Sequence, residues 1–449
     1  MMTSEEKREL YMRAYNEHKD EVDARIVDGI EKNRKGWCKI RLTDENGVPV
    51  SGRTVKINQK THDFKYGANI FMLDEFDDEV KNTEYRRFFK EYFNLATVPF
   101  YWCDLEPVEG KPRYDKNSVK VYRRPAPELC MEYCEENGLD AKLHCLVYES
   151  WVPDWVKNLP LGDVKKKYEE RFRRISERFS GRMFEFEVIN ELLCEETWKK
   201  KSVLSEQRNI LEWSFKTARR YFPNETLMIN EGNPLPTLAR ADYRSAYFLM
   251  IEKALLNGAQ IDKIGLQNHL FTGANAHNPE EYEQSLKSGI YMNDPNVYFK
   301  GLDVISDLGL PLELTEVTVP TFGETAEDEE LQADMLKLWY SVWFSHPNVD
   351  TIVYWNTVDG YAYDAPDSSW MENNCCGGLF HRDLTPKKSA LMLKKLFSET
   401  WHTNLELTTD KDGYAEFRGF FGMYSMETGG KEFELAIHKN ENCSFNISV

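Results

Sequence analysis

The sequence has little positive charge, no long apolar run and no motif that pairs cysteines or binds zinc. Asp and Glu number 75 against 57 Lys and Arg, which gives a net charge of −18 over 449 residues. Phosphate backbones and anionic lipids need basic partners, so this balance excludes nucleic acid and membrane as partners and leaves neutral ligands open. No run of about 18 apolar residues occurs that would cross a membrane.

The start of the sequence and its cysteines both bear on location. Residues 1–26 are charged throughout and lack the apolar core of a signal peptide. The nine cysteines are an odd number and include no CxxC pair, which predicts reduced thiols. We therefore expect a cytoplasmic protein, with a secreted protein as the alternative if a leader has been removed.

What the sequence does have is a large apolar and aromatic content. Hydrophobic residues make up 41% and aromatic residues 13%, with 11 Trp and 23 Tyr. This is enough for a large core and an accessory domain. Aromatic side chains also suit the faces of sugar rings, although any single one is expected in the core.

The two ends of the chain read as β-structure, after a helical start. Residues 1–35 are polar, rich in Glu and Lys, and predicted to be helical. The segment 36–62 alternates apolar and polar residues around a turn at 45–47, which predicts a hairpin, and 403–449 has the same texture. One hairpin is too small to be stable alone. We therefore predict that these two segments meet as one small β-sandwich, with 63–402 as the catalytic unit.

The middle of the chain alternates eight short apolar runs with amphipathic helical stretches. Eight β/α units over roughly 330 residues predict the α/β class and a (β/α)8 TIM barrel. The runs lie at 64–70, 93–98, 141–147, 183–190, 226–231, 263–268, 311–316 and 351–355.

Polar side chains follow most of these runs, at the end where a barrel of this kind builds its site. Glu191 and Glu316 follow the fourth and seventh runs, on opposite sides of the barrel axis. Two carboxylates that face each other across a cleft suit glycoside hydrolysis. A metal site is the weaker interpretation because no HExxH motif occurs, and we expect no cofactor. The other strand-end residues are His144, Asn190, Asn230, Glu231, Gln267, His269 and Trp355.

These strand ends carry motifs that resemble family 10 of the glycoside hydrolases, the (β/α)8 endo-β-xylanases. "FEFEVINE" resembles the acid/base motif of that family, and "LELTEVTV" its nucleophile motif. The segments "KLHCLVYESWVPDW", "MINEGN", "IGLQNHL" and "VYWNTVDGYAYDAPDSSW" are similar to its third, fifth, sixth and eighth strand ends. The resemblance covers residues 64–398, and its six motifs follow in the family's order.

The resemblance implies a retaining double displacement in which Glu316 attacks the anomeric carbon. Glu191 would act first as acid and then as base, because a charged Glu316 nearby keeps it protonated for the first step. Asn190 would bind the sugar 2-hydroxyl, while Gln267 and His269 would hold Glu316. The resemblance also implies three residues around the −1 sugar, namely His144, Trp355 and Trp370.

The sequence departs from the family where the distal sugar binds. If Trp102 is aligned, Val98 and Tyr101 stand where xylanases of the family carry an Asn and a Lys that grip the −2 xylose. Three positions on the third strand also differ, and so does one after Trp370: these are Tyr148, Glu149, Trp151 and Met371. Retained catalytic residues with changed glycone contacts predict the same chemistry on a different sugar or aglycone.

The replacements on the third strand predict a changed acceptor side. Glu149 and Trp151 are expected to make the cleft more acidic and more aromatic. Tyr148, Trp151 and Trp155 are expected to stack on a sugar or an apolar aglycone.

Three functions are therefore in competition. The leading one is a retaining β-glycoside hydrolase that cleaves β-1,4-xylan or xylo-oligosaccharides. The second keeps the mechanism but acts on glycosylated small molecules, such as saponin-type or aryl glycosides, which the expected cytoplasmic location favours. The third, a carbohydrate-binding protein without turnover, is the weakest because both carboxylates are present.

Overall fold

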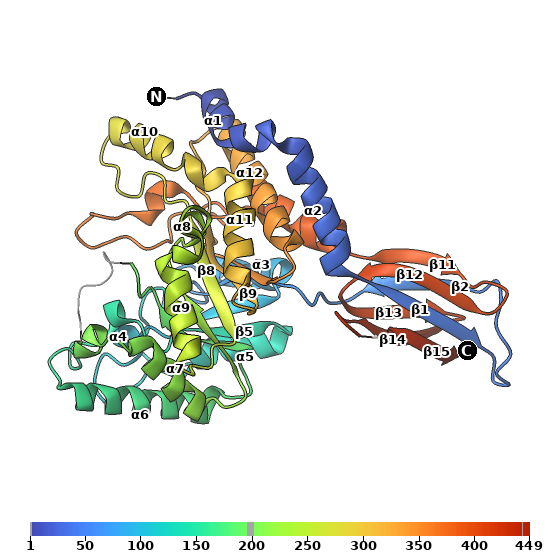
Figure 1. Cartoon of the computed structure of the whole chain (residues 1–449), viewed down its shortest axis with the longest axis horizontal. Helices are drawn as coiled ribbons and strands as arrows, with labels where there is room; N and C mark the ends of the chain where they lie inside the picture. Colours follow the sequence, from blue (N-terminus) through green and yellow to red (C-terminus); the bar gives the residue numbers. More distant parts are fainter. Residues whose placement is uncertain (1, 195–201, 442) are drawn as a thin grey trace.

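A computed structural model describes residues 2–194, 202–441 and 443–449, and it consists of a barrel with a narrower β-module projecting from it (Figure 1). Eight parallel strands close the barrel in the order β10-β3-β4-β5-β6-β7-β8-β9. The predicted α/β class and TIM barrel are thereby confirmed, and each predicted apolar run overlaps one strand. The strands are β3 (Lys65–Asn69), β4 (Leu95–Pro99), β5 (Asp140–His144), β6 (Glu185–Asn190), β7 (Thr226–Asn230), β8 (Lys263–His269), β9 (Leu312–Thr318) and β10 (Val349–Tyr354).

Helices surround this barrel, and α6 (Leu161–Phe179) shows how one of them buries an apolar face. In this helix the buried residues Val164, Tyr168, Phe172 and Ile175 recur every three or four positions, which is the period of one helix face. The other helices are α3 (Glu79–Tyr92), α4 (Trp102–Leu105), α5 (Pro127–Asn137), α7 (Ile210–Tyr221), α8 (Leu235–Ala241), α9 (Ala246–Leu256), α10 (Pro279–Ser288), α11 (Pro295–Ser306), α12 (Ala326–Ser345) and α13 (Lys388–Lys395). Among the described residues, no helix combines the length and the apolar character needed to cross a membrane.

Two helices at the N-terminus, α1 (Ser4–Glu17) and α2 (Lys19–Arg34), pack against α12 on the outside of the barrel (Figure 1). Thr3 and Glu6 form a capping box that begins α1. The buried ammonium of Lys7 bonds Asp328 at 3.2 Å and the carbonyl of Phe322 at 2.7 Å. These contacts attach the helical start of the chain to the barrel, and α2 then leads into the β-module.

The β-module is built from both chain ends, as predicted, and is a sandwich of two sheets. A three-stranded sheet has the order β12-β1-β15, and a four-stranded sheet has the order β11-β2-β13-β14. The strands are β1 (Lys35–Thr43), β2 (Thr54–Gln59), β11 (Asn404–Thr408), β12 (Tyr414–Phe420), β13 (Gly422–Thr428), β14 (Lys431–Ile437) and β15 (Ser444–Ser448). The module encloses an apolar core separate from that of the barrel, with Ile40, Leu42, Val55, Ile57 and Met426 among its members.

The turn predicted at 45–47 forms, with an antiparallel bridge between Thr43 and Pro49, but the long strands on either side of it do not pair because they belong to opposite sheets. β1 pairs with β12 and β15, whereas β2 pairs with β11 and β13. The alternation that suggested a hairpin gives β1 and β2 one apolar face each. Two such faces bury more apolar surface facing each other across a sandwich than side by side in one sheet.

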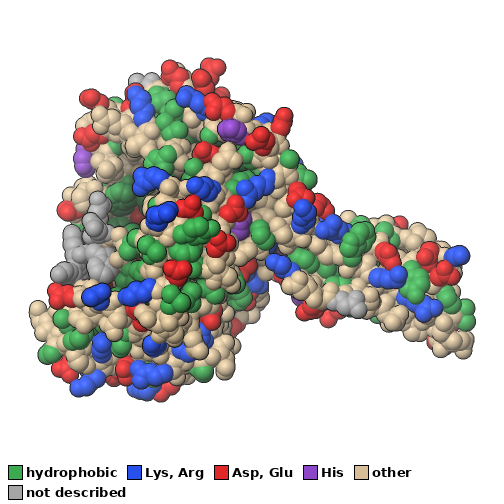
Figure 2. Space-filling view, viewed as in Figure 1, with side chains coloured by type: hydrophobic (Ala, Val, Ile, Leu, Met, Phe, Trp, Pro, Cys, Tyr) green, Lys and Arg blue, Asp and Glu red, His purple; other side chains and the backbone are tan. Residues whose placement is uncertain are grey.

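Charged side chains of both signs are interspersed over the face of the molecule that Figure 2 shows. This agrees with the absence of a strong basic patch in the sequence. The barrel interior is less usual. Instead of the branched apolar residues that commonly fill such barrels, it contains Lys142, Glu185, Lys263 and Glu313, all at most 3% exposed.

Candidate active site

The predicted site residues converge at the ends of four neighbouring strands. Asn190 is the last residue of β6 and Asn230 the last of β7, while Gln267 lies on β8 and Glu316 on β9. Glu191 directly follows β6 with φ of 54°, a left-handed conformation that residues other than glycine seldom adopt. Its N–H is held by the carbonyl of Asn230 at 3.1 Å. The strained turn takes the chain out of the strand and leaves the Glu191 side chain at the mouth of the barrel.

A single amide nitrogen joins the two candidate catalytic carboxylates. Gln267 Nε2 donates to Oε1 of Glu191 at 2.9 Å and to Oε1 of Glu316 at 3.0 Å. Carboxyl groups lie roughly 5–5.5 Å apart in retaining glycosidases and roughly 6.5–9.5 Å apart in inverting ones. A shared donor fits the shorter separation.

Glu316 lies deep in the site and is surrounded by donors. Besides Gln267, Asn230 Nδ2 lies 3.0 Å from its Oε1 and His269 Nε2 lies 3.2 Å from its Oε2. The residue is 5% exposed. Donors at both oxygens stabilise the ionised carboxylate and fix its orientation.

Glu191 occupies a more open position. It is partly exposed, whereas Glu316 is buried. Its Oε2 accepts the hydroxyl hydrogen of Tyr148, and its Oε1 accepts from Gln267. A carboxyl group at the mouth is better placed to exchange a proton with solvent or a leaving group than one at the base of the site.

Burial raises the pKa of the Glu316 carboxyl well above its usual range. The positive charge of His144 opposes this effect, and the negative charge of Glu191 adds to it. The sequence argument placed the extra proton of the pair on Glu191. In the structure it is Glu316 that desolvation affects, and desolvation favours the protonated form of this carboxyl.

His269 is neutral where it meets Glu316. Burial lowers the pKa of its imidazole to about 4. Its Nδ1 lies 2.9 Å from the hydroxyl of Thr318. If that hydroxyl donates to Nδ1, Nε2 carries the single ring hydrogen and donates it to Glu316.

The side chain of Asn190 is oriented by its neighbours. Its Oδ1 accepts from Asn230 Nδ2 at 3.0 Å and from Gln267 Nε2 at 3.3 Å. The hydroxyl of Thr315 in turn donates to Asn230 Oδ1 at 2.5 Å. Since both donors take the oxygen, the amide nitrogen of Asn190 is the end that faces away from them and can donate to a ligand.

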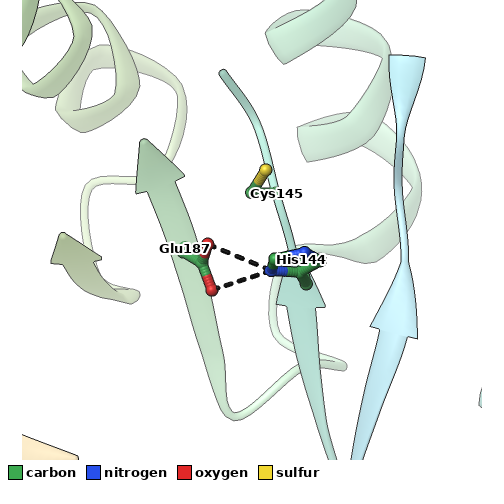
Figure 3. Close-up of side chains that lie close together, drawn as sticks. All are labelled: His144, Cys145 and Glu187. Carbon is green, nitrogen blue, oxygen red and sulfur yellow. Dashed lines mark hydrogen bonds and ion pairs between the residues drawn. The ribbon is translucent and has the colours of Figure 1, made fainter. Parts of the chain in front are cut away.

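His144 is held by one partner on each ring nitrogen. Its Nδ1 lies 3.0 Å from both carboxylate oxygens of Glu187, as Figure 3 shows, and its Nε2 lies 3.0 Å from the hydroxyl of Tyr101. A sugar hydroxyl that bound His144 would therefore share Nε2 with Tyr101 or displace it. Tyr101 thus contacts directly the histidine that sequence reasoning assigned to the −1 sugar.

The same histidine belongs to a group of three potential metal-ligand side chains (Figure 3). The candidate ligand atoms of His144, Cys145 and Glu187 all lie within 4.8 Å of one another. Burial raises the pKa of the Cys145 thiol well above its usual range, so the thiolate that a metal prefers is disfavoured. Glu187 already serves His144 and lies 3.7 Å from the ammonium of Lys142. His144, Glu187 and Lys142 thus pair with one another, and this favours a hydrogen-bonded group over a metal site.

Aromatic rings line one wall of the site. Phe71, Tyr101 and Trp355 form a buried cluster, and the partly buried Tyr148 and Trp151 pack against it. The ring centroid of Trp355 lies 5.3 Å from that of His144. The wall therefore joins the predicted Trp355, Tyr148 and Trp151 to Tyr101.

Trp370 approaches the same wall from the loop after β10. Its ring meets Phe271 edge-on at 5.3 Å, and Phe271 stacks on His269 at 4.4 Å. The rings of Phe271 and His269 thus connect Trp370 to Glu316.

Two residues of this wall were missed by sequence reasoning. Phe71 comes soon after the first barrel strand, so the strand-end rule would have found it. Arg124 lies in the long loop between α4 and α5, where no sequence pattern marks it. Its guanidinium lies 3.9 Å from the ring centroid of Tyr101, and its Nε bonds Asp104 at 2.9 Å. Arg124 therefore covers one face of Tyr101 with a cation–π contact.

The expectation that Glu149 makes the cleft more acidic is wrong. Glu149 is 5% exposed and accepts hydrogen bonds from the hydroxyls of Tyr168 at 2.7 Å and Ser202 at 2.6 Å. It anchors the start of the loop after β5 to α6 and to the segment at Ser202. Val98 is likewise buried, within β4, and carries no polar group toward a ligand.

The comparisons with known proteins agree with this geometry. The family model described as Glycosyl hydrolase family 10 matches residues 79–395. Since this is well over half of the chain, the protein belongs to that family of glycoside hydrolases. The resemblance drawn from the strand-end motifs is thereby confirmed.

Individual relatives are distant and mostly longer. The chain is 26% identical over 401 residues to anti-sigma-I factor RsgI6 of Acetivibrio thermocellus, which covers 88% of this chain and 45% of the relative. It is 25% identical to endo-1,4-beta-xylanase 2 of Arabidopsis thaliana, covering 88% of this chain and 32% of the relative. This chain thus spans less than half the length of either relative.

Solved structures show the same fold. Xylanase 10B from Thermotoga petrophila RKU-1, solved in complex with xylobiose, superposes with a TM-score of 0.57 at 20% identity. The match covers 75% of this chain and 95% of that one.

Proposed function

We propose that this protein is a retaining β-glycoside hydrolase that cleaves β-1,4-xylan or xylo-oligosaccharides by double displacement. The observation that carries the proposal is the shared hydrogen-bond donor, Gln267, between Glu191 and Glu316. Membership of the family and the xylanase relatives support the substrate class. Because those relatives are longer than this chain, their substrate is carried over only as part of this proposal, which the carboxylate pair in the site supports.

Glu316 is the nucleophile in this proposal. Its carboxylate forms a bond to the anomeric carbon while the bond to the leaving oxygen breaks. The donors at both of its oxygens hold it in one orientation and favour its charged form. Burial opposes that charge, so the carboxylate is reactive when ionised.

Glu191 is the acid and then the base. It gives its proton to the leaving oxygen in the first step. The ester on Glu316 removes the neighbouring negative charge, so Glu191 is left as a carboxylate that takes a proton from water in the second step. Its partial exposure at the mouth of the barrel supports this assignment.

The remaining polar residues position the sugar or the nucleophile. The oriented amide of Asn190 donates to the 2-hydroxyl of the −1 sugar, a contact that strengthens in the transition state. Gln267 and His269 hold Glu316. The rest of the proposed binding set is His144, Trp355 and Trp370 at the −1 sugar, with Tyr148 and Trp151 on the acceptor side.

A second candidate keeps this mechanism but acts on glycosylated small molecules. The observation in its favour is Tyr101, which occupies Nε2 of His144 and carries Arg124 on its ring. Contacts between protein side chains thereby take the place of contacts to a distal sugar. A carbohydrate-binding protein without turnover is the third candidate, and the intact carboxylate pair argues against it.

Hydrolysis by the purified protein separates these candidates. Aryl β-xyloside, xylo-oligosaccharides, xylan and aglycone-bearing glycosides would be tested side by side, with Glu316→Gln as the inactive control. Proton NMR of the first product reports its anomeric configuration. Retention with xylan or xylo-oligosaccharides as the best substrates supports the proposal, whereas inversion, or binding without turnover, contradicts it.

A further inference from the structure

A chain of buried ion pairs runs through the barrel below the site. Lys142 on β5 lies nearest the site, and its Nζ contacts Glu313 at 2.6 Å and Glu187 at 3.7 Å. Glu185 lies 3.8 Å from the same nitrogen. The side chain of Lys142 is 1% exposed and the three carboxylates are fully buried.

A second lysine continues the chain toward the opposite end of the barrel. Lys263 Nζ lies 2.8 Å from Glu185, 3.6 Å from Glu313 and 3.0 Å from Asp350. Asp350 at the start of β10 is 46% exposed and meets solvent. The chain thus connects the floor of the site to the far end of the barrel, with a lysine near each end.

Within this chain of ion pairs, the buried carboxylates outnumber the lysines. Three buried carboxylates, Glu185, Glu187 and Glu313, face two lysines. Burial raises the pKa of Glu185 to about 7. Glu187, at the upper end, is paired with His144. Burial disfavours a charged imidazole there, but the charge of Glu187 and its hydrogen bond outweigh burial and raise the pKa of His144.

We propose that Lys142 is a positioning residue for the reaction: its buried ammonium, 3.7 Å from Glu187, holds the carboxylate that orients His144. The inference rests on the proposed function. Lys142 touches no substrate, so its role in the reaction is an indirect one. Lys142 acts on His144 through its contact with Glu187, and its positive charge also opposes the rise in the pKa of Glu316.

The sign of the effect follows from the groups around Glu316. Burial raises the pKa of Glu316, while the positive charges of His144 and Lys142 lower it. Removing Lys142 therefore raises the pKa of the nucleophile, so a higher pH is needed to ionise it. The titratable and charged groups that face Glu316 or Lys142 are Tyr101, His144, Tyr148, Glu185, Glu187, Glu191, Lys263, His269, Glu313 and, through Lys263, Asp350.

The chain itself offers a matched control. Lys142→Met and Lys263→Met each remove one buried lysine from the same set of ion pairs, so both should lower the thermal unfolding midpoint. Of the two lysines, Lys142 is the one that contacts Glu187, the hydrogen-bond partner of His144. In kcat/KM for an aryl β-glycoside, the acid limb should move up by about 0.5–1 pH unit in Lys142→Met. It should stay in place in Lys263→Met.

Two further variants keep the test decisive if Lys142→Met does not fold. Lys142→Arg retains the charge and should retain the wild-type acid limb. The double variant Lys142→Met with Glu313→Gln removes the closest ion pair as a unit, which a buried site tolerates better than one lone charge. It should still show the shifted limb.

Equal shifts in the two lysine variants, or no shift in any folded variant lacking Lys142, would overturn the inference. An inactive wild-type protein would instead contradict the proposed function.

Discussion

Gln267 is the residue through which the two carboxylates meet, since its amide nitrogen reaches an oxygen of each. Being neutral, it brings Glu191 and Glu316 together without deciding which of them holds a proton. For Glu316, burial raises the pKa and the positive charges of His144 and Lys142 oppose that rise. Single substitutions should therefore separate the roles of the two carboxylates.

Glu316→Ala should abolish turnover of every glycoside, because no nucleophile remains. Glu191→Ala should spare aryl glycosides with good leaving groups, which need no proton in the first step. Added azide should restore its rate, since azide can replace the water that the base would activate. Labelling with a 2-fluoro glycoside, followed by mass spectrometry, should place the sugar on Glu316. Equal losses on good and poor leaving groups in Glu191→Ala, without azide rescue, would remove Glu191 from the acid/base role.

With Tyr101 and Val98 at these positions, a distal sugar should contribute little to kcat/KM. Charge-assisted hydrogen bonds of the kind that an Asn and a Lys would supply are worth about 1.5–3 kcal/mol each. Remote binding energy of this kind normally lowers the barrier at the reacting centre. With Tyr101 occupied by His144 and Arg124, kcat/KM for an aryl xylobioside should be close to that for the aryl xyloside.

The control for this ratio is Trp151→Ala, which leaves Tyr101 in place. If recognition lies on the acceptor side, it should lower kcat/KM for both substrates and leave their ratio unchanged. A ratio of several hundredfold in the wild-type protein would show that a strong −2 subsite exists and that the second-strand alignment is wrong.

At the scale of elements, strands and their polar ends were predictable from the sequence, and contacts between elements were not. The eight apolar runs correspond to strands because buried parallel strands need continuous apolar residues. Glu191 and Glu316 were found because a carboxylate at a strand end must be solvated, paired or used. Glu149 looked equally available, but Tyr168 and Ser202, which are distant in the sequence, bury it. Arg124 and the pairing of β1 likewise depend on partners that no local pattern identifies.

The junction between the barrel and the β-module packs around a buried histidine, which makes it sensitive to pH. His62 is 7% exposed, and its Nε2 lies 3.0 Å from the carbonyl of Trp401. Burial lowers the pKa of His62 from 6.5 to about 3. Below pH 6.5 the unfolded chain binds a proton that the folded protein excludes, so the free energy of unfolding falls by about 1.4 kcal/mol per pH unit, until the pH reaches about 3.

Other groups titrate in the same pH range, so the effect of His62 is the difference in stability between the wild type and His62→Gln. Between pH 6.5 and pH 5, denaturant unfolding of the wild type should lose about 2 kcal/mol more than that of His62→Gln. His277→Gln, at an exposed position, serves as the control and should follow the wild type. Parallel pH curves for the wild type and His62→Gln would show that His62 is not the group responsible.

For the whole molecule, the β-module ties the two ends of the chain together around their own apolar core. β1 and β2 arrive before the barrel, and β11–β15 arrive after it, yet each sheet contains strands from both ends. In the sequence the barrel thus lies between two segments that must pair with each other for the module to form. We propose that residues 36–62 and 403–449 act as one structural unit and the barrel, 63–402, as another.

Removal of residues 403–449 should therefore expose the apolar faces of β1 and β2, with Ile40, Leu42, Val55 and Ile57 among the uncovered side chains. The truncated chain should lose most of its soluble yield and elute as aggregates in size-exclusion chromatography. A matched control removes only 444–449, the edge strand β15, which leaves the pairing of β1 with β12 and of β2 with β11 and β13 in place. That shorter deletion should stay soluble and keep its activity. If instead the longer deletion is monomeric and unfolds at the wild-type temperature, the two chain ends do not depend on each other, and the module is not one structural unit.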